Sequence, residues 1–358
     1  MRPESLEFFK SIVNIPSPSG YEERAAELYR QYTSPFAHKV ETNVHGSVWA
    51  VLNPEAKTKV MLAGHMDEIG FIVVNISDDG FIYFSRIGGH DTVIPLGQRV
   101  WIHTEQGPLA GVIGRKPIHL LESSEREKRP ELHDMWIDVG ASSKSEIESR
   151  VEVGDCITYQ WEFAQLMGDR VTARGFDNKM GAFIVAEALR LLHEEGGLHP
   201  DVGVYATATV QEEIGLRGAT TSAFAIDAQS GLAVDVGFSI DHPGVSKTRY
   251  GAIEMGKGPS VARGANINPE VYKILKKTAA EDKISIQIEA EGGATGTDAA
   301  AMQLTRSGMA TGLVGVPIRY MHTPCETLCL QDVVECARLM AGYCRRVTPE
   351  TSFIPRVS

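Results

Sequence analysis

The sequence predicts an α/β fold, an α/β/α sandwich into which a small all-β unit is inserted. From residue 177 onward, helical and strand patterns alternate, which is typical of a sheet covered by helices. Much earlier, residues 47–52 and 59–63 have the pattern of strands of the same buried kind. Between these parts, residues 70–165 carry short β-runs and turn residues, with a helical pattern only around 143–150. We therefore expect the β-rich block to be an insertion.

Two helices are expected at the start of the chain, at residues 3–14 and 20–33, separated by the turn PSPSG. The α/β part resumes with a helix at 178–195, for which the preceding Asp is a candidate cap. Nearly continuous apolar runs at 201–210 and 231–237 predict strands buried on both faces. The remaining elements are a helix near 268–280, a strand near 284–289, a helix near 298–307, a strand near 310–316 and a helix near 330–346. The expected domains are residues 1–70 plus 166–358 for the α/β part and 71–165 for the insert.

The composition limits the functions to consider. The chain has 358 residues, 43% of them hydrophobic and 23% charged, which is typical of a globular protein. Its net charge of −11 argues against a nucleic-acid-binding protein, because no surplus of cations exists to neutralise phosphates. No apolar run approaches the roughly 20 residues of a membrane helix, and the start MRPESLEFFK does not resemble a signal peptide. The five cysteines are an odd number and no secretory signal accompanies them, so we expect a cytoplasmic protein. From the charge and the apolar runs, we expect it to bind neither nucleic acid nor membranes.

Two segments place pairs of polar side chains at the end of a predicted strand. His65 and Asp67 follow the strand 59–63 in AGHMDEIGF, and a nearby carboxylate often holds the second ring nitrogen of a metal-ligating histidine. Glu212 and Glu213 follow the strand 201–210 in TVQEEIGLRG. In extended chain, one of two adjacent glutamates can bind metal while the other faces a water. The structural alternatives are a hydrogen-bonded core histidine and a solvated loop tip.

Three further residues have similar placements. Asp177 stands where a loop meets a helix, so it either caps that helix or bridges two ions with its two oxygens. Asp235 interrupts an apolar strand, and a buried carboxylate needs a partner or a cation. His322 follows a predicted strand in RYMHTPCE.

Together these residues predict a metal centre, because the carboxyl ends of strands in an open α/β sheet meet in one crevice. Two histidines and three carboxylates form a nitrogen and oxygen ligand set that suits zinc, cobalt or manganese. These five ligands can hold two ions that share one carboxylate, as in two-metal hydrolases. The spare Glu212 beside Glu213 is then the candidate general base.

The motifs GHMDEIGF, GFDNKMGAF, VQEEIGLRGA, AVDVG, GTDAAA and RYMHTPCET resemble a known family. They are similar to the glutamyl and deblocking aminopeptidases that form tetrahedral (TET) particles, metallopeptidase family forty-two. The resemblance runs from about residue 5 to about 345, in the same order and spacing. It implies a catalytic α/β domain with two divalent metal ions, zinc before cobalt or manganese, and an inserted PDZ-like β-barrel for dimerisation. It also implies short peptides as substrates and assembly through dimers into a dodecamer.

The resemblance implies a role for each candidate residue. The implied metal ligands are His65 and Asp235 for one ion, Glu213 and His322 for the other, and Asp177 between them. Asp67 would orient His65, and Glu212 would move a proton from the attacking water to the leaving amine. The loop GGATGTD at 292–298 would shape the substrate pocket, although the family often has GGGTDA there. His119 matches a recurrent position for which we expect a structural or interface role.

Two other functions stay open. A dinuclear N-acyl amino acid deacylase would use the same ligands on a different bond, although the inserted block and EEIGLRG favour a peptidase. A non-enzymatic assembly protein would keep the fold and lose a ligand or Glu212, and none of these is lost. The sequence therefore predicts a metal-dependent aminopeptidase that hydrolyses the N-terminal peptide bond of short peptides.

Overall fold

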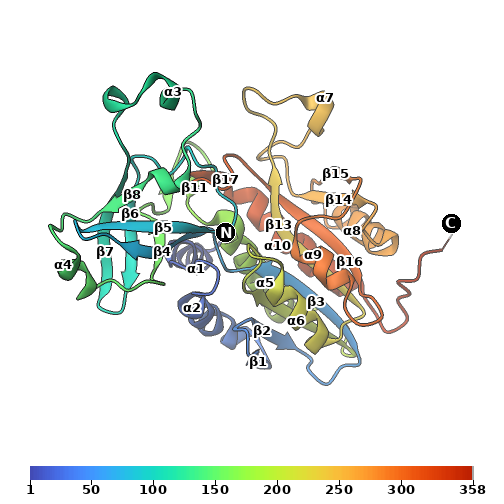
Figure 1. The fold of residues 1–358 in the computed structure, drawn as a ribbon. Helices are drawn as coiled ribbons and strands as arrows, with labels where there is room; N and C mark the ends of the chain where they lie inside the picture. Colours follow the sequence, from blue (N-terminus) through green and yellow to red (C-terminus); the bar gives the residue numbers. More distant parts are fainter. Residues whose placement is uncertain (357–358) are drawn as a thin grey trace.

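The computed structural model describes residues 1–356 and divides into a helix-covered sheet and a closed barrel (Figure 1). The strands of the sheet are β1 Lys39–Thr42, β2 Val48–Leu52, β3 Thr58–His65, β12 Val202–Thr209, β13 Ser230–Phe238, β14 Ser260–Gly264, β15 Gln287–Glu291 and β16 Ala310–Ile318. Within the described chain they form one eight-stranded sheet in the order β1-β2-β12-β3-β13-β16-β14-β15. The central strands β12, β3, β13 and β16 run parallel, so their carboxyl ends lie at one edge.

Helices cover both faces of the sheet. One face carries α1 Pro3–Asn14, α2 Glu23–Thr33, α5 Phe176–Glu195, α8 Pro269–Glu281 and α10 Leu330–Arg346. The other carries α6 Arg217–Ile226 and α9 Asp298–Gln303. Each face has its own hydrophobic core, as expected for an α/β/α sandwich.

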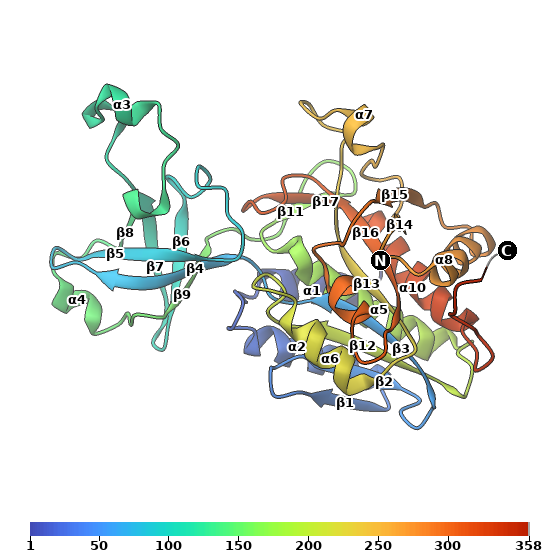
Figure 2. The ribbon, with the colours of Figure 1, turned by 45° about the vertical axis from the view of Figure 1, so that its right-hand side comes forward.

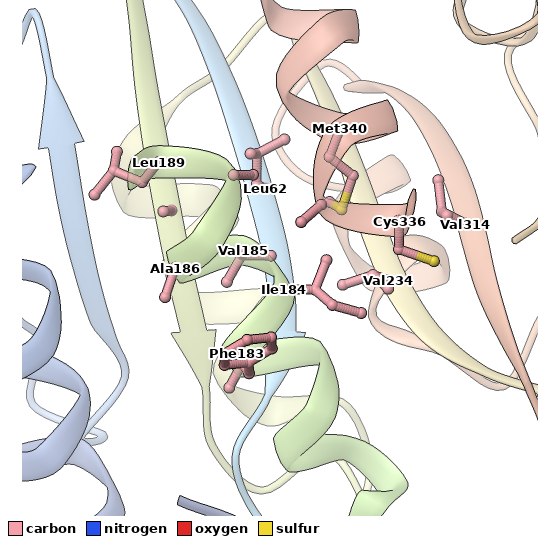
Figure 3. Packing of buried hydrophobic residues seen from close by; sticks show 14 of the residues in the cluster. Leu62, Phe183, Ile184, Val185, Ala186, Leu189, Val234, Val314, Cys336 and Met340 are labelled. Atoms are coloured by element: carbon pink, nitrogen blue, oxygen red, sulfur yellow. The ribbon is translucent and has the colours of Figure 1, made fainter. Parts of the chain in front are cut away.

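The central helix of the first face is α5, which is buried along most of its length. Figure 3 shows Phe183, Ile184 and Leu189 of α5 packed beside Leu62 of β3, with Met340 of α10 nearby. Burying one such side chain contributes about 1.5–3 kcal/mol. This packing fixes the start of α5, and with it Asp177, relative to the ends of the parallel strands.

Between residues 70 and 159, six strands close into an antiparallel barrel in the order β4-β5-β8-β7-β6-β9. They are β4 Gly70–Ile76, β5 Phe81–Ile87, β6 Arg99–Thr104, β7 Gly107–Gly114, β8 Trp136–Asp138 and β9 Cys156–Tyr159. The barrel has a separate core that includes Phe71, Ile82 and Ile137. Between β7 and β8 the chain makes a long excursion that carries α3 Ser123–Arg126 and projects away from the barrel (Figure 2). A further short helix, α4 Lys144–Glu148, precedes β9.

The chain crosses between sheet and barrel at two adjacent places. Residues 66–69 lead from β3 into β4, and the return passes through β10 Ala164–Gln165 and β11 Arg170–Ala173. The buried Glu68 of the first crossing contacts Arg174 of the second and lies 2.8 Å from Lys179 Nζ of α5. In addition, β11 pairs with β17 Glu326–Cys329. The remaining short helix, α7 Lys247–Tyr250, lies on an excursion after β13 (Figure 1).

The predicted α/β sandwich with an inserted β-barrel is confirmed. The helix predicted at 20–33 begins at Glu23, and the one predicted at 298–307 ends at Gln303, after which Arg306 has a φ of 48° that a helix does not accept. Several elements, among them β1, β11, α6, β14 and β17, have no counterpart among those predicted, because the strands are short and α6 contains few large apolar residues. The domain boundaries stay a prediction. Across residues 1–356, none of the helices has the length and apolarity needed to cross a membrane.

Candidate metal centre

The parallel strands bring four of the predicted residues to one edge of the sheet. His65 is the last residue of β3, and Glu212 and Glu213 lie just beyond β12, whose Thr209 is paired with His65. Asp235 belongs to β13, the other neighbour of β3, and lies inside that strand rather than at its end. The predicted convergence of these side chains in one place therefore holds in the structure.

A close approach of helix and strand places α5 beside His65. A Cβ at Gly64 would lie 2.3 Å from the carbonyl carbon of Gly181, a distance that real side chains do not reach. Only glycine at position 64 allows α5 to pack this tightly against the end of β3. The start of α5, which carries Asp177, is thereby held next to the histidine.

Asp67 is a fully buried carboxylate that fixes its surroundings. It accepts the backbone N–H groups of Glu212 and Glu213 at 3.0 and 3.1 Å and the hydroxyl of Ser19 at 2.6 Å. Its Oδ1 also lies 3.3 Å from Nδ1 of His65. Burial opposes ionisation, but the contact with His65 and these hydrogen bonds hold the pKa of Asp67 below its usual value. Asp67 thus connects the end of β3 to the loop that carries Glu212 and Glu213. It also orients His65 so that Nε2 faces the other predicted ligands.

Asp177 does not cap α5, contrary to one interpretation of the sequence. Both Asp177 and Asn178 have non-helical backbone angles. The cap comes from Asn178, whose Oδ1 accepts the backbone N–H of Gly181 at 3.0 Å. The carboxylate of Asp177 is therefore not engaged by the helix and faces the two histidines.

His322 comes from the loop after β16 and has a φ of 59°, which is unusual for a residue other than glycine. A buried carboxylate, Glu326, holds this conformation: its Oε1 accepts the backbone N–H of His322 at 2.9 Å. Its Oε2 accepts the backbone N–H of Asp177 at 3.0 Å. Glu326 was not among the predicted site residues, although it stands in the motif HTPCET. No pattern in the sequence reveals that it would contact Asp177, which lies 149 residues earlier.

The side chains converge in two groups that share Asp177. In the first, Nε2 of His65 lies 3.3 Å from Asp177 Oδ1 and 3.9 Å from Asp235 Oδ1. In the second, Nε2 of His322 lies 3.1 Å from Asp177 Oδ2 and 3.8 Å from Glu213 Oε1. Ligands about 2.1 Å from a tetrahedral ion lie about 3.4 Å from one another, so both groups have the spacing of a metal site.

Carboxylates outnumber cations here, and their pKa values reflect this. Burial raises the pKa of Glu212 to about 9 and that of Asp235 to about 8, and neighbouring carboxylates add to both shifts. Burial also raises the pKa of Glu213. Asp177 behaves differently: burial opposes its ionisation, but hydrogen bonds with His322 and His65 lower its pKa. The two histidines do not balance the carboxylates, so the centre is short of positive charge.

The residues present fit two divalent cations. Oε1 of Glu213 is buried and has no hydrogen-bond partner among the described residues, although it faces His322. An unpaired buried carboxylate oxygen is costly unless a cation compensates it. The donors are imidazole nitrogens and carboxylate oxygens, which suit zinc, cobalt or manganese.

A hollow of about 280 Å³ opens over this centre. Besides the ligands and Glu212, it is lined by Val236, Phe238, Gly296, Thr297 and Met321. Gly296 and Thr297 belong to the loop 292–298 that the resemblance assigned to the substrate pocket. His119 is exposed on the projecting excursion of the barrel and does not belong to the centre.

Comparisons with known proteins agree with this arrangement. A family model described as M42 glutamyl aminopeptidase matches residues 46–339. The lysyl aminopeptidase of Pyrococcus furiosus is 34% identical over 346 residues, which are 96% of this chain and 97% of that protein. The TET aminopeptidase from the marine sediment archaeon Thaumarchaeota archaeon SCGC AB-539-E09 is 34% identical, with 98% of each chain covered and a TM-score of 0.92.

A third similar protein is the TET1 peptidase of Pyrococcus horikoshii, at 32% identity and a TM-score of 0.83, with 94% of this chain and 98% of that one covered. Its structure is described as assembling into a tetrahedron or a large octahedral shell. The similarity covers nearly the whole length of these proteins, as the motifs predicted. The chain therefore belongs to the M42 glutamyl aminopeptidase family and is an aminopeptidase, a hydrolase that acts on peptide bonds.

Proposed function

We propose that this aminopeptidase depends on two divalent metal ions and removes the N-terminal residue of short peptides. The observation that carries the proposal is the position of Asp177, whose two oxygens face His65 and His322 at 3.3 and 3.1 Å. A carboxylate between two imidazoles, each with a further carboxylate beside it, is suited to be shared by two ions. Zinc is the proposed metal, with cobalt or manganese as alternatives, because the ligand set is imidazole and carboxylate.

Each ligand has a proposed place. His65 and Asp235 would hold one ion, Glu213 and His322 would hold the other, and Asp177 would be shared by both. This division follows the two groups of neighbouring ligand atoms. Asp67 and Glu326 are positioning residues, since they hold the histidines and the backbone of Asp177 in place.

The proposed reaction assigns proton transfer to Glu212. Two bound divalent ions would polarise the scissile carbonyl and lower the pKa of the attacking water. The Glu212 carboxylate accepts a proton from that water and then donates it to the leaving amine. Its Oε2 lies 3.7 Å from Nε2 of His65, so it stands at the edge of the ligand groups. Asp67 keeps it there, because Asp67 accepts the backbone N–H groups of both glutamates.

The test is Glu212→Gln, which keeps the shape of the side chain and removes its basicity. We expect turnover of an aminoacyl-p-nitroanilide to fall by about 10²–10⁴-fold, the usual contribution of a general base. Metal content by elemental analysis should stay near that of the unchanged protein, whereas Asp235→Asn should lower it. A variant that retains full activity, or activity on N-acetylated amino acids in place of aminoacyl anilides, contradicts the proposal.

We also propose that residues 71–165 are a dimerisation domain inserted into a catalytic domain formed by residues 1–70 and 166–358, and that dimers assemble into a tetrahedral dodecamer. Apolar side chains exposed on the barrel and its excursion, including Val74, Val112, Ile118 and Leu120, support an interface there. Light scattering should then give a mass near twelve times 39.0 kDa. A mass of one chain at micromolar concentration contradicts this assembly.

A further inference from the structure

Near the proposed metal ligand Asp235, the carboxylate of Glu289 makes no ion pair with any described residue. Asp235 and Gly237 are two residues apart on β13, so they face the same side of the sheet. Gly315 of β16 is the backbone partner of Asp235. Oε2 of Glu289, on β15, lies 3.5 Å from the position that a Cβ of Gly237 would occupy and 3.6 Å from that of Gly315. The Glu289 carboxylate therefore lies on the Asp235 side, next to two residues that have no side chain.

The surroundings of Glu289 leave its charge uncompensated. Among the described residues, its one side-chain hydrogen bond is the hydroxyl of Ser260, donated at 2.8 Å. Burial raises the pKa of Glu289, and the nearby Glu291 adds to the shift. Arg319, which follows β16, is engaged by Asp241 at 2.7 Å. A half-buried carboxylate without a cation is unfavourable, so a positively charged guest would be stabilised there.

The position of Glu289 suits the first side chain of a bound peptide. Asp235 is a proposed ligand, so the scissile bond lies above it, and Gly237 is about 7 Å further along the strand. An aliphatic stem of several methylene groups can span this distance over the glycines. Met321 lines the hollow beside the proposed ligands, and its apolar surface suits such a stem.

We infer that the enzyme prefers peptides whose first residue is basic, with Glu289 binding the ammonium or guanidinium group of that residue. This inference rests on the proposed function, because it takes Asp235 as a metal ligand. A lysyl side chain supplies both the aliphatic stem and the positive charge. A norleucyl side chain supplies the unbranched stem without the ammonium group. A glutamyl residue would bring a second carboxylate close to Glu289 and is disfavoured.

The experiment compares lysyl, norleucyl, leucyl and glutamyl p-nitroanilides with the zinc-loaded full-length protein. We expect kcat/KM for the lysyl substrate to exceed that for norleucyl by about tenfold or more, the contribution of one charge-assisted hydrogen bond. In Glu289→Gln the lysyl-to-norleucyl ratio should fall toward one, and in Glu289→Lys the glutamyl substrate should gain on the lysyl one. Glu281→Gln, an exposed carboxylate on α8, is the matched control and should keep the original ratio.

Each outcome decides the inference. A lysyl-to-norleucyl ratio of one or less in the unchanged protein overturns it without reference to any variant, as does a high ratio that persists in Glu289→Gln. Both results leave the proposed aminopeptidase mechanism standing, since hydrolysis continues. Hydrolysis of none of the four substrates by the zinc-loaded protein instead removes the proposed function and this inference together.

Discussion

Two clusters of buried charged residues lie close together in the chain and have opposite charge balances. In the first, Glu68 is paired with Arg174 and Lys179, and although burial opposes its ionisation, the two cations lower its pKa to about 2. In the second, around His65, burial and neighbouring carboxylates raise the pKa of Glu212 to about 9 and that of Asp235 to about 8. Glu68, Glu212 and Asp235 are all buried, so burial alone does not explain the difference.

The comparison separates a structural cluster from a binding site. Glu68 has cations from its own chain and ties the two crossings between sheet and barrel to α5. The carboxylates of the second cluster have too few cations in the described chain, and an oxygen of Glu213 has no partner there. The charge of Glu68 is balanced by its own chain, whereas the second cluster has the charge that the proposed metal ions would balance.

The largest expected effect is on stability, from Glu68→Gln. This substitution leaves Arg174 and Lys179 buried without an anion, which costs about 3–5 kcal/mol of unfolding free energy. Denaturant unfolding of the metal-free protein measures it. Glu55→Gln, an exposed residue, is the control and should change stability by about 0.5 kcal/mol or less. A loss no greater than that of the control would mean that the first cluster is not needed for folding.

Acid should weaken the first cluster in a defined range. The pKa of Glu68 is lowered from 4.5 to about 2, so its contribution is present above pH 4.5 and is lost as pH falls toward 2. The loss is about 3 kcal/mol, since one pKa unit corresponds to about 1.4 kcal/mol. Unfolding free energies measured from pH 5 to pH 2 should show a steeper fall for the unchanged protein than for Glu68→Gln. Equal slopes contradict the assignment of the pKa shift to this cluster.

Metal should stabilise the second cluster and leave the first unaffected. Free zinc at a hundred times its dissociation constant should add about 2.7 kcal/mol for each ion that binds only the folded state. Thermal or denaturant unfolding of the metal-stripped protein with and without zinc measures the gain. The gain should persist in Glu68→Gln and be reduced in Asp235→Asn. A gain that is lost in Glu68→Gln and kept in Asp235→Asn would reverse the roles given to the two clusters.

The smallest expected effect comes from Glu326→Gln. The N–H groups of Asp177 and His322 are accepted by different oxygens of Glu326, and a carboxamide replaces one of these oxygens with an NH2 donor, so one N–H loses its acceptor. We expect zinc affinity to fall by about 10–100-fold, as is usual for groups that position metal ligands. Titration of the stripped protein with zinc, followed by turnover, would show a higher zinc requirement. Glu335→Gln on α10 is the control, and an equal affinity in both variants would show that Glu326 does not position the ligands.

The sequence predicted the α/β sandwich, the inserted β-barrel and the residues that meet at the centre. It could do so because His65 and the Glu212–Glu213 pair end apolar strands, and parallel strands end at a common edge. Glu68 and Glu326 were missed, although both lie inside quoted motifs. Their partners are far along the chain, 106 residues from Glu68 to Arg174 and 149 from Asp177 to Glu326, and a single sequence does not reveal such pairing.

Asp177 shows the same limit at short range. Its position before a helix favoured a cap, and a cap is indeed made there, but by the next residue, Asn178. Asp and Asn have similar preferences at that position, so the pattern alone does not decide between them. The packing of α5 against β3 decides, because it turns the carboxylate toward the histidines.

The central claim is that the second cluster needs two metal ions for catalysis. The most direct measurement is a zinc titration of the metal-stripped protein in which bound zinc per chain, from elemental analysis, is compared with turnover of an aminoacyl-p-nitroanilide. The account predicts negligible turnover without metal and maximal turnover as bound zinc approaches two ions per chain. Full turnover by the stripped protein, or none with two ions bound at this centre, would contradict it.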